Sequence, residues 1–161
     1  MGKQMMMRPY FESKQRQKLL KAELDSWLNT PWRHMCMIKG RGCDCIGLVA
    51  GVLVNVGFLQ PEEINLPPYP PDWHLHKEHL ELLNWFKSRP DVIEVTGSTG
   101  SLQNGDILLF QYGKSPSHVG IFFEKNIYHS VTHRYVIASP LKDPNLKKRL
   151  VSVFRCMEEI K

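Results

Sequence analysis

The sequence predicts an α+β domain in which N-terminal helices pack on a central antiparallel β-sheet. Apolar residues recur at helical spacing in the first half of the chain, and short β-type runs fill the second half. The chain has 161 residues, of which 42% are hydrophobic and 23% charged, so it is long enough for one domain with its own core. We therefore expect a single domain over residues 1–161, with a flexible N-terminus at residues 1–12.

Three helices are predicted in the first half of the chain. Residues 13–28 have an amphipathic pattern that ends at an Asn-Thr-Pro sequence. Asp44 is a favourable N-cap for a second helix at residues 45–56, which is apolar on nearly every side and is therefore expected to be central and buried. A third helix fits residues 75–88, after a proline-rich, extended segment at residues 59–73.

Six short strands are predicted in the second half. Their alternating or continuous apolar runs are bounded by turn sequences, as is typical of an antiparallel sheet. The runs cover residues 92–95, 106–112, 118–124, 126–131, 134–138 and 150–154. Residues 32–43, which include Gly40 and Gly42, are expected to be irregular.

Charge and composition narrow the classes of partner. Lys and Arg number 21 and Asp and Glu number 16, which gives a mild formal net charge of +5. The basic run at residues 147–149 has no nucleic-acid-binding motif beside it, so we expect no nucleic-acid partner. No apolar run reaches the roughly 18 residues of a membrane span, and the N-terminus lacks the apolar core of a signal peptide. We therefore expect no membrane span, and cytoplasmic synthesis without a signal peptide.

Cys45 is the first candidate for chemistry. At the start of a buried helix, unpaired backbone N–H groups and the helix dipole lower the pKa of a thiol and are placed to stabilise an oxyanion. A thiolate at this position is a nucleophile that needs a base. A buried structural cysteine is the alternative interpretation.

His118 and His129 are the candidate base and its partner. His118 begins one apolar run and His129 ends the next. If the two strands are adjacent and antiparallel, the imidazoles lie side by side and one ring can orient the other. A hydrogen-bonded core or surface histidine is the alternative interpretation of each.

Metal binding is the main chemical alternative. One group, made up of His34, Cys36, Cys43 and Cys45, lacks the Cys-x₂-Cys spacing typical of zinc sites. A second group, made up of His74, His76 and His79, is typical of a solvated helix start. We therefore expect no metal and no cofactor.

Three sequence boxes, in order, resemble the NlpC family of papain-like cell-wall cysteine peptidases. Residues 42–49 resemble its Asp-Cys-Ser-Gly-Leu-Val box, with Ile46 in place of the serine. Residues 105–110 and 118–122 resemble the second box, and His129 stands where the family has its third, polar residue.

The resemblance implies a papain-like fold and a role for each of these residues. Cys45 is then the nucleophile, His118 the base and His129 the residue that orients His118. The implied substrate is an amide bond in peptidoglycan stem peptides. For substrate binding we assign Asp44, which precedes the nucleophile, and three aromatic residues, Trp32, Tyr69 and Trp73.

The closest resemblance is to the subgroup encoded in phage and gene-transfer tail modules. It rests on residues 70–74 and on Phe154-Arg155. The resemblance implies phage tail proteins as partners and a tail-associated location from which the protein acts on the cell wall. Two alternatives stay open: an inactive structural or binding tail component, and an amidase or acyltransferase that acts on another amide.

Overall fold

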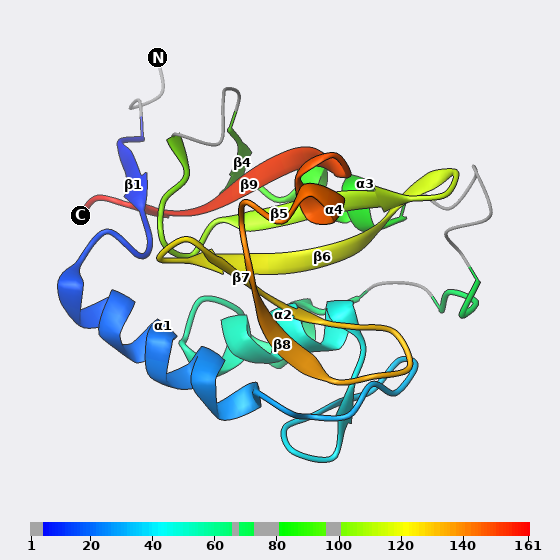
Figure 1. The fold of residues 1–161 in the computed structure, drawn as a ribbon. Helices are drawn as coiled ribbons and strands as arrows, with labels where there is room; N and C mark the ends of the chain where they lie inside the picture. The colour runs from blue at the N-terminus through cyan, green and yellow to red at the C-terminus, as the bar shows by residue number, and fades with distance from the viewer. Residues whose placement is uncertain (1–4, 66–67, 73–80, 96–100) are drawn as a thin grey trace.

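The computed structural model describes residues 5–65, 68–72, 81–95 and 101–161. In this part of the chain, seven strands form one sheet in the order β1-β9-β5-β6-β7-β8, and β4 also pairs with β9 (Figure 1). All of these pairings are antiparallel. The strands are β1 (Met7–Pro9), β4 (Val92–Glu94), β5 (Ile107–Tyr112), β6 (Ser115–Phe123), β7 (Asn126–Ser130), β8 (Val136–Pro140) and β9 (Leu150–Glu159).

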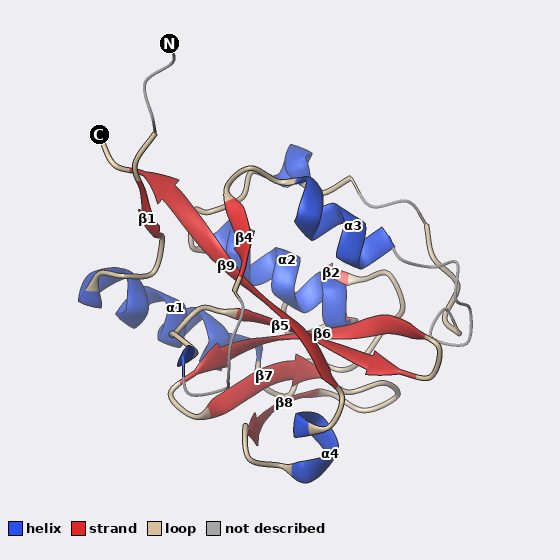
Figure 2. Cartoon of the chain, turned by 90° about the horizontal axis from the view of Figure 1, so that it is seen from above, coloured by secondary structure: helices blue, strands red, loops and turns tan. Residues whose placement is uncertain are grey.

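Helices cover both faces of this sheet. The main core lies on the face where α2 packs against β6 and β7, and it includes Leu24, Leu48, Phe86 and Val119. On the opposite face, where Figure 2 shows the short helix at residues 144–147, Leu146 joins a smaller apolar cluster. The helices are α1 (Lys14–Trp27), α2 (Cys45–Asn55), α3 (Glu81–Ser88) and the single-turn α4 (Pro144–Lys147). The predicted α+β class, with N-terminal helices on an antiparallel sheet, is confirmed.

Local chemistry explains where the first two helices begin and end. The Ser13 hydroxyl caps α1 by accepting a hydrogen bond from the backbone N–H of Arg16 at 3.2 Å. The Asp44 carboxylate caps α2 by accepting one from the backbone N–H of Gly47 at 2.7 Å. Gly57, with φ +89°, follows α2 in the left-handed conformation that commonly ends a helix.

The N-terminal segment differs from the predicted flexible tail. Met7 pairs with Glu159, and the backbone N–H of Tyr10 donates to the carbonyl of Cys156 at 2.9 Å. Phe11 is only 5% exposed in the core. Burial of Phe11 and strand pairing with the edge of β9 together attach the segment from β1 onward to the domain, which the weak apolar pattern of residues 1–12 does not indicate.

Other boundaries also differ from the sequence prediction. Residues 32–43 contain a small hairpin of β2 (Met37–Ile38) and β3 (Gly42–Cys43), which was not predicted. β6 begins at Ser115, before His118, because β5 and β6 form a hairpin that turns at Gly113, with φ +75°. A 3₁₀ turn at Pro61–Glu63 lies in the proline-rich segment. α3 is described from Glu81 onward, and the start of the helix predicted at residues 75–88 lies outside the described residues.

Among the described residues, no helix combines the length and the hydropathy that a membrane-spanning segment needs.

Candidate active site

Cys45 is the first residue of α2, as predicted. The Asp44 cap holds the helix start, and Gly47 lets the backbone of Cys36 pass close by, since a β-carbon at Gly47 would overlap the carbonyl oxygen of Cys36. The helix is buried over its first nine residues, from Cys45 to Leu53. The nucleophile candidate is therefore placed by a rigid, central element.

The first half of β6 brings the sheet to the sulfur. The register of β6 with β7 runs from Phe123 to Ile121, and Ser117 lies before this paired part of the strand. The Cys45 thiol donates to the carbonyl of Ser117, with a sulfur–oxygen distance of 3.7 Å. The sulfur thus contacts the strand that carries His118.

His118 and His129 are in direct contact. Nε2 of His118 lies 2.8 Å from Nδ1 of His129, and Nε2 of His129 lies 2.8 Å from the Ser139 hydroxyl on β8. Gly120 permits this approach, because a β-carbon there would lie 2.9 Å from the carbonyl oxygen of Tyr128 and 3.2 Å from the β-carbon of His129. The predicted side-by-side arrangement of the two histidines is present.

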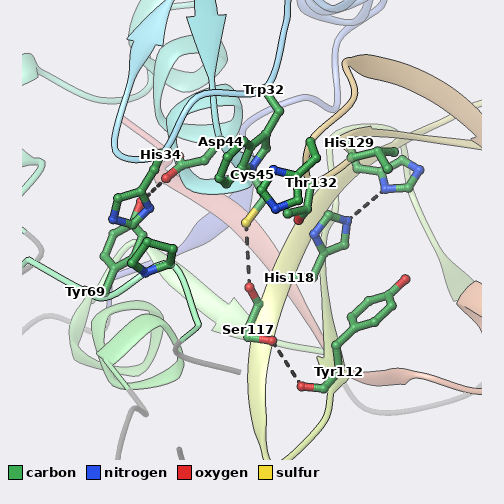
Figure 3. Close-up of a pocket in the computed structure, with 13 residues that line it drawn as sticks. Trp32, His34, Asp44, Cys45, Tyr69, Tyr112, Ser117, His118, His129 and Thr132 are labelled. Carbon is green, nitrogen blue, oxygen red and sulfur yellow. Dashed lines mark hydrogen bonds between the residues drawn. The ribbon is translucent and has the colours of Figure 1, made fainter. Parts of the chain in front are cut away.

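One cavity of about 430 Å³ brings these groups together. Figure 3 shows the Cys45 sulfur and the His118 ring turned toward this space, with His129 behind His118. The cavity is lined by Trp32, His34, Asp44, Cys45, Tyr69, Pro71, Tyr112, Ser117, His118, His129, Val131, Thr132 and His133. The nucleophile and base candidates therefore share a space large enough for a peptide segment.

An aromatic cluster from three separate segments borders the cavity. The Trp32 ring lies 4.7 Å from the ring of His133, and the His34 ring meets the Tyr69 ring edge-on at 5.2 Å. The Tyr69 hydroxyl donates a short hydrogen bond to the Asp44 carboxylate. The proline-rich segment is thereby attached beside the helix start and forms part of the cavity wall.

Burial sets the resting charge of the candidate nucleophile and base. It raises the pKa of the Cys45 thiol from 9.0 to about 12 and lowers the pKa of the His118 imidazole from 6.5 to about 3. The charge of Asp44 adds to the rise at Cys45, and the backbone N–H groups of Val119 and Ile46 oppose it. The sequence predicts a lowered thiol pKa, and the structure reverses this direction because desolvation outweighs the helix N-terminus.

His129 is neutral for the same reason. Burial lowers its pKa from 6.5 to about 4, and the opposing effect of Asp143 is smaller. Near neutral pH the free site therefore holds a thiol and two uncharged imidazoles, so a proton that leaves Cys45 can move to His118 without any change in the net charge of the pair.

The predicted substrate-binding residues divide into two groups. Trp32, Asp44 and Tyr69 line the cavity. The Asp44 carboxylate is occupied by the backbone N–H groups of Met35 and Gly47 and by the Tyr69 hydroxyl, so its role in this structure is to hold the cavity wall and the helix start. Trp73 lies outside the described residues.

Several site residues were not identified from the sequence. Ser117 precedes the predicted base, and its contribution is a backbone carbonyl that no side-chain pattern marks. Ser139 contacts His129 only through the register of β7 and β8. Tyr112 and His133 reach the cavity from a hairpin and a turn, and His133 has φ +62°.

The structure bears on only one of the two groups of residues considered for metal binding. Among the described residues, no three or more His, Cys, Asp or Glu side chains are arranged to hold a metal ion. The described cysteines are all free thiols. The cluster of His74, His76 and His79 lies outside the described residues.

Comparison with known proteins identifies the family. The sequence profile of the NlpC/P60 family matches residues 29–155, which include Cys45, His118 and His129. The fold and the cysteine–histidine cleft fit that match, and the chain belongs to the NlpC/P60 family. No curated protein sequence matches the chain.

Solved structures with the same fold include a domain of a peptidoglycan hydrolase and a protein described as non-catalytic. A Staphylococcus aureus NLP/P60 family protein, described as similar to lipoprotein, has a TM-score of 0.64 and 18% identity over 92% of this chain and 43% of its own. The NlpC/p60 domain of the peptidoglycan hydrolase SagA has a TM-score of 0.56 and 15% identity, over 85% of this chain and 96% of that one. RipD from Mycobacterium tuberculosis, described as non-catalytic and adapted to peptidoglycan binding, has a TM-score of 0.53 and 13% identity, over 89% of this chain and 98% of its own. The chain spans less than half of the S. aureus protein. At these low identities, the structural likeness shows a shared fold alone.

Proposed function

We propose that this protein is a cysteine hydrolase that cleaves an amide bond in peptidoglycan stem peptides. The observation that carries the proposal is the shared cavity of Cys45, His118 and His129, in which the two histidines are 2.8 Å apart. Membership of the NlpC/P60 family and the peptidoglycan hydrolase SagA among the structural neighbours support the choice of substrate.

The acylation step follows from the placement of these groups. Nε2 of His118 is engaged with His129, so Nδ1 is the nitrogen left to accept the Cys45 proton. As that proton moves to His118, the sulfur bonds to the carbonyl carbon, and the carbonyl π electrons become an oxyanion beside the backbone N–H of Cys45. The oxyanion then reforms the carbonyl, the C–N bond breaks, and His118 gives its proton to the leaving amine.

Deacylation repeats these steps with water. His118 takes a proton from the attacking water, and the tetrahedral intermediate collapses by breaking the C–S bond. The proton returns to sulfur, which restores the neutral thiol and imidazole. The products are an amine and a carboxylic acid, and the buried pair stays neutral before and after each turnover.

Digestion of purified peptidoglycan, with mass spectrometry of the fragments, tests this proposal. The protein is expected to release fragments that identify one cleaved amide, and Cys45→Ser is expected to lower the rate at least about a thousandfold. Cys36→Ser is the matched control, because it makes the same atomic change in a half-buried thiol that does not line the cavity.

The same digestion separates the alternatives. Peptidoglycan that binds folded protein and stays intact would refute hydrolysis and indicate the binding role described for RipD. Fragments joined to an added amine nucleophile would indicate acyl transfer in place of hydrolysis.

The phage-tail association is part of the proposal and rests on sequence resemblance. Of the residues that suggested it, Phe154 stacks on Phe86 in the core, and Arg155 forms an ion pair with the buried Asp106 at 2.8 Å. These contacts give the Phe-Arg pair a structural role. Detection of the protein in purified tail particles, by immunoblotting, tests the association, and its absence from them would refute it.

A further inference from the structure

The hydrogen-bond chain that starts at His118 does not end at His129. The Ser139 hydroxyl lies 2.8 Å from Nε2 of His129, and Ser139 is 7% exposed and His129 5% exposed. In the β7–β8 register His129 pairs with Ile137 and Ser139 pairs with Ile127, so Ser139 lies diagonally opposite His129 on the same sheet face. This contact is therefore built into the sheet.

We propose that Ser139 is a positioning residue of the active site, whose hydroxyl oxygen accepts the Nε2 proton of His129 and thereby leaves Nδ1 of His129 as an acceptor for His118. The proposal deepens the cysteine-hydrolase function and rests on it for its catalytic meaning. It concerns a residue that contacts neither the sulfur nor the cavity.

Two proton arrangements fit the observed distances. In the first, Nε2–H of His118 donates to His129, Nε2–H of His129 donates to Ser139, and Nδ1 of His118 is free to act as a base. In the second, the Ser139 hydroxyl donates to His129, Nδ1–H of His129 donates to His118, and Nδ1 of His118 carries the remaining proton. A base is available to the thiol only in the first arrangement.

Proton transfer from Cys45 makes the first arrangement obligatory. Once His118 has taken the thiol proton, both of its ring nitrogens carry hydrogen, so Nδ1 of His129 must accept. The single proton of neutral His129 then sits on Nε2, inside the protein, where the Ser139 oxygen is its partner. A buried N–H without an acceptor is rare and costly, which is why the hydroxyl matters.

Loss of the hydroxyl favours the inactive arrangement. In Ser139→Ala the Nε2 proton of His129 has no acceptor at this position. Moving that proton to Nδ1 lets it donate to His118 and leaves only a lone pair unsatisfied at Nε2. His118 then carries its own proton on Nδ1, and its function as a base is lost.

Nuclear magnetic resonance can read these arrangements without any substrate. Two-bond ¹H–¹⁵N correlations in ¹⁵N-histidine-labelled protein distinguish the two ring protonation states, and His118→Asn and His129→Asn assign the signals. We expect Nε2–H on both histidines in the unmodified protein and Nδ1–H on both in Ser139→Ala. Unchanged signals in folded Ser139→Ala, or Nδ1–H on His129 in the unmodified protein, would overturn the proposal.

Two further variants separate positioning from simple loss of packing. Ser139→Thr keeps the hydroxyl and is expected to restore Nε2–H on both histidines. Ser130→Ala removes another buried hydroxyl, from the neighbouring strand, where it donates to the Cys43 carbonyl at 2.9 Å. This control is expected to lower the melting temperature and to leave both histidine signals unchanged.

Kinetic measurements connect the arrangement to catalysis. Ser139→Ala is expected to lower kcat/KM for peptidoglycan by about 10- to 100-fold with KM little changed, and to slow alkylation of Cys45 by iodoacetamide at neutral pH. If the unmodified protein cleaves peptidoglycan and Ser139→Ala cleaves it equally well, the positioning role is wrong and the proposed function stands. If the histidine signals and alkylation change as expected but no form of the protein cleaves peptidoglycan, the positioning role stands and the proposed function is wrong.

Discussion

Mild acid is expected to destabilise this protein through two buried histidines of the candidate active site, His118 and His129. Burial holds the pKa of His118 at about 3 and that of His129 at about 4, whereas a histidine in the unfolded chain titrates near 6.5. Below pH 6.5 the unfolded state therefore binds protons that the folded state does not. The free energy of unfolding must fall as the pH falls through this window, and the loss is complete near the folded pKa values.

The size of the loss follows from the two pKa values. Between pH 7 and pH 5, a histidine that ionises only in the unfolded state contributes a loss of about 2 kcal/mol. Two such residues give about 4 kcal/mol, which is a large fraction of the typical 5–15 kcal/mol for unfolding a domain. The window also separates histidines from carboxylates, because the lowered pKa values of Glu23 and Glu158 place their own losses below about pH 4.5.

Urea unfolding at pH 7, 6 and 5 tests this expectation. The double variant with His118→Asn and His129→Asn is the control, since it removes both groups and is expected to lose about 4 kcal/mol less than the unmodified protein over the same range. The denaturant slope must stay constant for the comparison to hold. Equal losses in the two proteins would refute the claim that burial keeps these imidazoles neutral.

Three substitutions test other parts of the structure. Gly120→Ala places a β-carbon 2.9 Å from the Tyr128 carbonyl oxygen, so β7 must move, and we expect urea unfolding to show about 1–3 kcal/mol less stability. We also expect kcat/KM on peptidoglycan to fall at least about tenfold, and full activity would contradict the packing argument. Asp106→Asn removes the charge from a carboxylate that is 1% exposed and accepts two hydrogen bonds from Arg155 at 2.8 Å. The free energy of unfolding is therefore expected to fall by about 3 kcal/mol, and a fall of less than about 1 kcal/mol would contradict the importance of this ion pair. Tyr69→Phe removes a hydrogen-bond donor to Asp44 but leaves the α2 cap in place, so urea unfolding is expected to show a free energy of unfolding lower by about 1 kcal/mol. A decrease of more than about 3 kcal/mol would show that this hydrogen bond maintains the helix start.

Much of the secondary structure could be predicted because its causes are local. The Asp44 cap and the uniformly apolar residues after it placed the start of α2 at Cys45, as observed, and its end within one residue of Asn55. The strands β5 and β7 were predicted from short apolar runs, with small shifts at their ends. β1 and the extension of β9 to Glu159 were missed, because each of these short edge segments becomes a strand only when the other lies beside it.

The candidate site was predictable only in part. Cys45, His118 and His129 were identified from motif resemblance and helix position, and they line one cavity as expected. The direction of the thiol pKa was wrong, because a helix N-terminus is visible in the sequence and the depth of burial is not. The contribution of Ser117 was missed for a similar reason, since it is made by a backbone carbonyl, which every residue carries and no side-chain pattern marks.

By itself, the sequence indicated the fold class, most of the helices and strands, and the candidate nucleophile at a helix start, Cys45. These depend on interactions within a few residues, such as helix capping, apolar periodicity and turn chemistry. The tertiary structure alone decided which groups meet: Cys45 contacts a carbonyl 72 residues away, and His129 is held between His118 and Ser139 by the registers of three strands. The physical reason is that a strand's sequence specifies which residues share a face, whereas only pairing with its neighbours specifies which side chains on that face lie opposite each other.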